Sequence, residues 1–172
     1  MGGELFQRKI LSVSVPLIAT FLATFCVNLY SRSNIPIIVY HNVKNGIVSE
    51  KSYIDISKNN LETHLKYISQ NFEAITYDEL LAYHNKDLRF KNKKPILITF
   101  DDGLLSVYKY AYPLALKYNI KFTIAYFPGK YEPLAKVNKI TWQQLKEMKE
   151  SKIVEVASHS YDHVDLTTLE KN

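Results

Sequence analysis

Two adjacent carboxylates are the first candidates for metal binding or proton transfer. Asp101 and Asp102 directly follow the apolar residues 95–100 and precede Gly103. Like charges packed together raise each other's pKa unless a cation neutralises them. With a metal present, one carboxylate can bind the ion while the other accepts a proton from an attacking water. The alternative is a solvated turn, because Asp-Gly pairs favour turns.

Two histidines four residues apart form the second chemical group. His159 follows Ser158 at the end of another largely apolar segment, and His163 lies four residues further on. Two imidazoles and one carboxylate are a common ligand set for zinc or a related divalent ion. Each group alone is also compatible with ordinary surface or core packing. Their joint occurrence at two predicted strand ends favours a metal site formed by His159, His163 and one of the two carboxylates.

His41 is a further candidate, because it follows a third apolar segment. It could contact substrate, support the metal ligands, or be a structural histidine. His64 and His84 fall on predicted helices, and we expect them at the surface.

Four apolar segments predict the strands that would position these groups. They cover residues 35–40, 95–100, 120–127 and 153–157. The first is a continuous apolar run and the second is nearly so, which is typical of strands buried on both faces of a parallel sheet. Since function collects at the carboxyl ends of such strands, the carboxylates and histidines should share one edge. The third strand ends in Phe127-Pro128-Gly129, which has no polar side chain and can contribute to the site only through its backbone groups and its shape.

Helix-start signals separate the predicted strands. A capping side chain precedes an apolar periodic segment at Ser57, at Thr76 with Glu79, and at Thr141 with Gln144. Residues 108–118 are also predicted to be helical, with Pro113 near the first turn. Residues 43–55 are expected to form an irregular loop. The alternation predicts an α/β fold with a mainly parallel sheet.

An uncharged segment near the amino terminus predicts a membrane anchor. Residues 10–31 carry no charge, and Arg8, Lys9 and Arg32 flank them. The length suits a single transmembrane helix, with residues 1–9 in the cytoplasm and the remainder outside the cell membrane. A cleaved signal segment, which would release a secreted protein, is the alternative.

Composition bounds the other possibilities. The 172 residues carry a net charge of +5, and no basic block is interleaved with aromatic residues, so nucleic acid is not expected as a partner. Cys26 is the single cysteine, which excludes an intramolecular disulfide.

Two motifs resemble those of the polysaccharide deacetylases that share the NodB homology domain. Residues 99–103 (TFDDG) resemble the first motif of that family, and residues 159–163 (HSYDH) resemble its second motif, H-[ST]-x-x-H. Tyr40-His41 and residues 61–68 and 75–80 add to the likeness, which is greatest to the poly-N-acetylglucosamine deacetylase branch. The resemblance covers about residues 35–169.

This resemblance implies a fold, a reaction and a role for each motif residue. The fold would be a (β/α)7-type barrel. The reaction would be hydrolysis of N-acetyl groups on amino-sugar polymers such as poly-N-acetylglucosamine or peptidoglycan. Asp101 resembles the general base, and Asp102, His159 and His163 resemble the ligands of a divalent metal, for which zinc is expected.

The sequence departs from the family pattern after the second motif. The family continues with an Arg-containing motif, a Trp-containing motif and a histidine general acid, and none of these precedes Asn172. We therefore expect residues 35–172 to form a truncated domain holding about the first four strands of the barrel, with an unpaired edge and an exposed apolar flank. No general acid is assigned.

Three functions follow from this pattern. The first is a carbohydrate de-N-acetylase, and the second is a non-catalytic, membrane-tethered carbohydrate-binding remnant or subunit that retains the metal site. An unrelated metallohydrolase acting on phosphate or amide bonds is the third.

Overall fold

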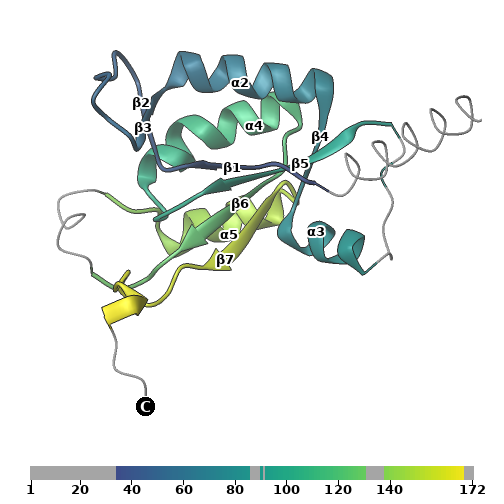
Figure 1. Ribbon diagram of the computed structural model, residues 1–172. Coiled ribbons are helices and arrows are strands. Elements are labelled where there is room, and N and C mark those ends of the chain that lie inside the picture. Colours follow the sequence, from purple (N-terminus) through teal and green to yellow (C-terminus); the bar gives the residue numbers. More distant parts are fainter. Residues whose placement is uncertain (1–33, 86–89, 91, 131–137, 169–172) are drawn as a thin grey trace, which may run out of the picture. The chain divides into compact units, whose positions relative to one another are not determined.

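A parallel β-sheet forms the centre of the computed structural model, which describes residues 34–85, 90, 92–130 and 138–168. Four strands lie in the order β1-β5-β6-β7, and a fifth, β4, also pairs with β5 (Figure 1). Every pairing is parallel, as the sequence predicts. The strands are β1 (Ile37–Tyr40), β4 (Phe72–Ile75), β5 (Lys94–Phe100), β6 (Phe122–Tyr126) and β7 (Val154–Ser158).

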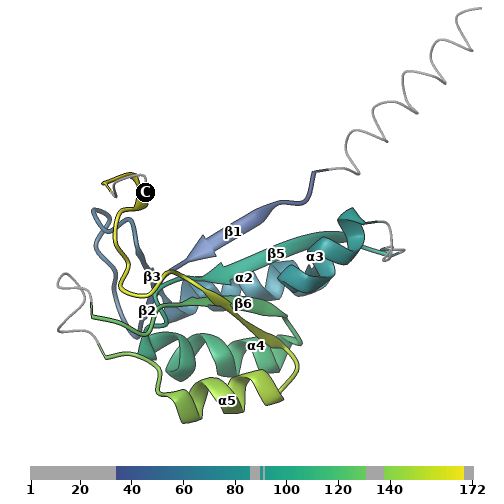
Figure 2. The ribbon, with the colours of Figure 1, turned by 90° about the horizontal axis from the view of Figure 1, so that it is seen from below.

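Three helices cover one face of this sheet (Figures 1 and 2): α2 (Lys58–Asn71), α4 (Tyr112–Tyr118) and α5 (Trp142–Glu150). Alternate residues of β5 and β6, among them Ile98, Phe100 and Ile124, pack into the same core as the helices. Their burial removes apolar surface from water, which is the main favourable term in folding. This core fixes the strands whose ends carry the candidate site.

The predicted helix starts are confirmed. Ser57 caps α2 through its side chain, and Thr76 with Glu79 and Thr141 with Gln144 form complete capping boxes. Each box satisfies two backbone N–H groups that a helix start would otherwise leave unpaired. The predicted helix at residues 108–118 begins instead with a π-helical turn, η1 (Val107–Ala111), before α4, and Pro113 lies in the first turn of α4.

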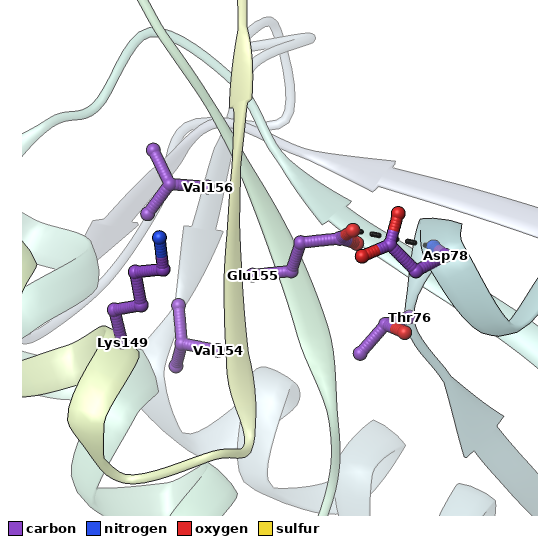
Figure 3. A pocket seen from close by; sticks show the side chains of 6 residues that line it. All are labelled: Thr76, Asp78, Lys149, Val154, Glu155 and Val156. Carbon is purple, nitrogen blue, oxygen red and sulfur yellow. Dashed lines mark hydrogen bonds between the residues drawn. The ribbon is translucent and has the colours of Figure 1, made fainter.

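Helix α3 (Tyr77–His84) is tied to the sheet by one acidic side chain. The Glu155 carboxylate on β7 accepts hydrogen bonds from the backbone N–H of Tyr77 (2.5 Å) and Asp78 (3.2 Å), and from the Thr123 hydroxyl on β6 (2.9 Å). Figure 3 shows Glu155 pointing from β7 toward the start of α3. A carboxylate suits this position because the start of a helix is partially positive.

Glu155 also lines a surface hollow of about 360 Å³ beside the amino-terminal half of β7 (Figure 3). The predicted chemical groups follow the carboxyl ends of β5 and β7, and none of them lines this hollow. The hollow is therefore separate from the candidate site.

Three expectations about the strands are wrong. β1 is not buried on both faces, because Ile37 and Val39 are 54% and 50% exposed. Residues 43–55 are not wholly irregular, since β2 (Asn42–Lys44) pairs in parallel with β3 (Asp55–Ser57). β4 makes the described sheet five-stranded rather than four-stranded.

Among the described residues, no helix is both long and apolar enough to cross a bilayer. The predicted cytoplasmic segment at residues 1–9 and the predicted anchor at residues 10–31 lie outside the described residues.

Candidate metal centre

Asp102 lies in a tight turn at the end of β5. The Asp101 N–H donates to the carbonyl of Tyr40 (2.9 Å), so the pairing with β1 continues past the last residue of β5. Asp102 and Gly103 then adopt left-handed backbone conformations, with φ of 71° and 65°. A side chain on Gly103 would overlap the Tyr126 ring. The turn is thus fixed by strand pairing and by close packing, and it leaves the Asp102 side chain 8% exposed.

The two histidines come from the loop that follows β7. The His159 N–H donates to the carbonyl of Tyr126 (3.0 Å), which aligns the start of this loop with β6. Ser160 and His163 have φ of 63° and 60°, and the His163 N–H donates to the Ser160 hydroxyl (3.0 Å). Left-handed conformations at non-glycine residues are uncommon and cluster at functional sites.

These elements bring the three predicted ligands together. The Asp102 Oδ1 lies 3.6 Å from His159 Nε2 and 3.3 Å from His163 Nε2. One ligand atom from each residue lies within 4.8 Å of the others. Ligand atoms about 2.0–2.1 Å from one zinc ion would be roughly 3.3 Å apart in a tetrahedral site. The two distances from the Asp102 oxygen are close to this value, as expected of side chains gathered around one small divalent cation.

The state of the Asp102 carboxylate supports the same conclusion. Its Oδ1 atom is buried and has no hydrogen-bond partner among the described residues. A buried carboxylate oxygen without a partner is costly unless a cation or a donor satisfies it. The donor set of one carboxylate and two imidazoles fits zinc or a similar ion.

Asp101 and His41, the other two predicted site residues, lie outside this cluster. Both are half-buried, at the ends of β5 and β1 respectively. Their roles as general base and substrate contact remain predictions. His64 and His84 lie exposed on α2 and α3, as expected.

The turn after β6 supports the histidine loop through backbone and shape, as predicted. The Gly129 N–H donates to the carbonyl of Tyr161 (2.6 Å), and a Cβ on Gly129 would lie 2.5 Å from that oxygen. The Phe127 ring centroid is 5.1 Å from that of His163 and 6.4 Å from that of His159. Only glycine at position 129 allows the two loops to approach this closely.

Lys139 is a residue near the site that sequence reasoning missed. Its ammonium donates to the carbonyl of Phe127 and lies 3.1 Å from the centroid of the Phe127 ring. Burial lowers the pKa of Lys139, and the charge of Asp102 opposes that shift. No motif marks this lysine, because its contacts form only when the loops around it fold.

A polar network that sequence reasoning also missed holds the loop after β1. The Ser106 hydroxyl donates to Asn42 Oδ1 (2.7 Å), and Asn42 Nδ2 donates to Asp55 Oδ1 (2.7 Å). Lys44 forms an ion pair with Asp55 (2.5 Å). Burial acts to raise the pKa of Asp55, but hydrogen bonds from Lys44, Ser52 and Asn42, together with the Lys44 charge, hold it below its usual value.

Sequence comparisons place this arrangement among known proteins. Residues 89–172 match the sequence model of a family described as polysaccharide deacetylase. The chain is 32% identical over 138 residues to YxkH of Bacillus subtilis, which is named as a polysaccharide deacetylase; the match covers 80% of this chain and 46% of YxkH. It is 31% identical over 125 residues to the poly-β-1,6-N-acetyl-D-glucosamine N-deacetylase of Staphylococcus aureus, covering 71% of this chain and 41% of that protein. This chain thus spans less than half the length of these relatives.

Solved structures show the same α/β deacetylase fold. The Streptococcus pyogenes deacetylase PplD, solved in complex with acetate, has a TM-score of 0.65 and 26% identity, covering 79% of this chain and 60% of PplD. IcaB from Ammonifex degensii has a TM-score of 0.63 and 31% identity, covering 74% of this chain and 53% of IcaB.

Proposed function

Because residues 89–172 belong to the polysaccharide deacetylase family, we propose that this chain carries the metal-binding part of a carbohydrate de-N-acetylase with a (β/α)7-type barrel. The observation that carries the proposal is the convergence of Asp102, His159 and His163 at one edge of the sheet, where the buried Asp102 Oδ1 faces both imidazoles but has no hydrogen-bond partner among the described residues. The parallel sheet and the likeness to PplD and IcaB support the barrel.

The proposed reaction is hydrolysis of an acetamide. Asp102, His159 and His163 would hold a divalent cation, with zinc as the first choice. When bound, such an ion supplies Lewis acidity toward the acetamide carbonyl and favours deprotonation of water. Asp101 would accept the proton of the attacking water. Water adds to the carbonyl carbon, and the C–N bond breaks as the nitrogen takes up the proton removed from the water, which releases acetic acid (acetate at neutral pH) and a free amine.

Amino-sugar polymers are the proposed substrate class, with poly-N-acetylglucosamine and peptidoglycan as candidates. The support is the S. aureus relative, whose name states activity on poly-β-1,6-N-acetyl-D-glucosamine. His41 lies at the end of β1, on the edge where β5 and β7 also end, and we propose that it contacts the sugar.

Acetate release tests the activity. We expect the purified chain, loaded with zinc or cobalt, to release acetate from N-acetylglucosamine oligomers, and Asp101→Asn to slow release by roughly 10²–10⁴-fold. Saturable oligomer binding without acetate release would favour the non-catalytic carbohydrate-binding subunit instead. Cleavage of phosphoesters in place of acetylated sugars would favour an unrelated metallohydrolase.

For localisation we propose a single-pass anchor at residues 10–31 with the catalytic domain outside the cell membrane. The support is the uncharged segment with Arg8 and Lys9 before it. In cells that make the full chain, it should sediment with membranes, and protease added outside should remove the domain. Recovery of a shortened, soluble chain from the medium would favour a cleaved signal segment.

A further inference from the structure

The backbone around Lys139 is attached to the turn that carries Asp102. Lys139 pairs with Leu104 in an isolated antiparallel bridge. The N–H of Ile140 donates to the carbonyl of Gly103 (2.9 Å), and the N–H of Leu105 donates to the carbonyl of Asn138 (2.8 Å). Movement of the Lys139 backbone therefore disturbs the Asp102 turn directly.

The side chain of Lys139 reaches in another direction, to the turn after β6. Its ammonium donates to the carbonyl of Phe127 and has a longer contact of 3.5 Å with the carbonyl of Gly129. It also lies over the Phe127 ring, an arrangement in which a cation is attracted to the negative face of the π-system. Carbonyls in a turn have no sheet partner, so an ammonium with several donors suits them.

The turn at residues 127–129, which Lys139 holds, also contacts the loop that carries His159 and His163. The Gly129 N–H donates to the carbonyl of Tyr161, which lies between His159 and His163 in the chain. The Phe127 ring, beneath the ammonium, lies next to both imidazoles. Hydrogen bonds thus run from the Asp102 turn, through the backbone and side chain of Lys139, to the loop that carries both histidines.

We propose that Lys139 is a positioning residue that sets the separation between Asp102 and the two histidines. This inference rests on the proposed metal centre. The carboxylate and the imidazoles come from loops after two different strands, β5 and β7. Pairing within the sheet fixes the strands but not the distance between these loops. A brace that joins both loops reduces this freedom before the metal binds. Groups that hydrogen-bond directly to metal ligands are typically worth about 10–100-fold in metal affinity, and a residue that acts through both loops should have an effect near the lower end of this range.

The test compares Lys139→Met with Lys121→Met in the full chain, using cobalt(II) as the probe. Lys121 is a matched control: it is also half-buried and adjoins β6, but it pairs with Glu79 near the opposite end of that strand. We expect Lys139→Met to weaken cobalt affinity by about tenfold or more and to change the cobalt absorption spectrum at saturating metal. Lys121→Met should leave both unchanged.

Two further variants separate positioning from general stability. Lys139→Arg keeps a cationic donor, so its cobalt affinity should be close to that of the unsubstituted protein. This comparison can be made even if Lys139→Met does not fold. Gly129→Ala, which places a methyl group against the Tyr161 carbonyl, should weaken cobalt binding while Lys139 is intact. Both are measured alongside the thermal midpoint of the metal-free protein.

Unchanged cobalt affinity and spectrum in a folded Lys139→Met protein would overturn the inference. It would also be overturned if Lys139→Met lowered the thermal midpoint equally with and without cobalt, since that pattern indicates a purely structural role. If the unsubstituted chain bound no cobalt, the proposed metal centre itself would be wrong. The two failures are therefore distinguishable.

Discussion

Asp102 combines three features that are unfavourable in a carboxylate without a cation. It is buried, its backbone is left-handed, and its Oδ1 atom has no hydrogen-bond partner within the described part of the chain. A left-handed backbone at a non-glycine residue costs roughly 1–2 kcal/mol, and burial of an unpaired charge costs more. A divalent cation bound to the carboxylate would remove the second of these costs.

The sequence predicted which residues cluster but not how they are held. Two adjacent carboxylates and two histidines are visible as residue types, and strand-end logic places them on one edge. Which of the two carboxylates joins the histidines depends on the backbone turn at residues 101–103. The roles of Lys139 and Gly129 arise from contacts between loops distant in sequence, and no local pattern encodes them.

Replacing Asp102 should separate metal binding from proton transfer. We expect Asp102→Ala to lower zinc affinity by at least about 100-fold, because it removes a ligand and not merely a group that orients one. Asp101→Asn should leave zinc affinity within error of the unsubstituted protein. Equilibrium competition with a chromogenic chelator measures both. Retention of zinc in both Asp102→Ala and His163→Ala would show that these residues are not the ligands.

Gly103 should tolerate no side chain. Gly103→Ala places a methyl group against the Tyr126 ring and forces alanine into a left-handed backbone, so we expect a loss of about 3 kcal/mol in the free energy of unfolding. Gly46→Ala is the control, because Gly46 also has a positive φ (143°), but a methyl group there would meet no described heavy atom within 4 Å. Urea titration should show the larger loss at position 103, and equal losses would contradict the packing argument.

At the scale of elements, the sequence predicted the helix starts, which depend on neighbouring residues, but not the short strands, which depend on pairing with remote residues. The capping side chains at residues 57, 76 and 141 act within one helical turn, so the sequence shows them directly. β2, β3 and β4 have three or four residues each, and their pairing partners are distant in sequence. The apolar run at residues 35–40 predicted the existence of β1 but not its exposure, because a run of apolar residues does not reveal whether one face or two are covered.

The Asp55 network should make the stability of the loop after β1 depend on pH. The folded-state pKa of Asp55 is depressed, so its stabilisation is present above the unfolded pKa, near 3.9, and is lost as pH falls through the lower folded value. We expect Asp55→Asn to cost about 1–2 kcal/mol at pH 7, with the difference from the unsubstituted protein shrinking below about pH 4.

Urea unfolding at pH 7, 5 and 3 measures this effect. Glu150→Gln is the control, since within the described segments Glu150 makes only an exposed ion pair with Lys146, at 3.9 Å, and should have little influence on stability. A pH-independent cost at position 55 would show that packing, not ionisation, is responsible.

At the scale of the whole molecule, the metal centre joins segments that are separated in the chain. Asp102 follows the central strand β5, whereas both histidines follow β7, and β6 lies between these strands. A bound cation would therefore cross-link the sheet edge. The match to relatives covers less than half of their length.

Metal binding should stabilise the folded domain through mass action. At a free zinc concentration about 1,000 times the dissociation constant, the free energy of unfolding should rise by about 4 kcal/mol. Thermal unfolding followed by circular dichroism should show a higher midpoint with zinc, and Asp102→Ala should abolish this increase.

The most direct test of the metal centre is an anomalous diffraction map from crystals of the zinc-loaded chain, measured at the zinc absorption edge. We predict one strong peak about 2.0–2.2 Å from an Asp102 carboxylate oxygen and from one nitrogen of each of His159 and His163. A map with no peak among these three side chains, or with the zinc bound elsewhere on the chain, would contradict the proposed metal centre.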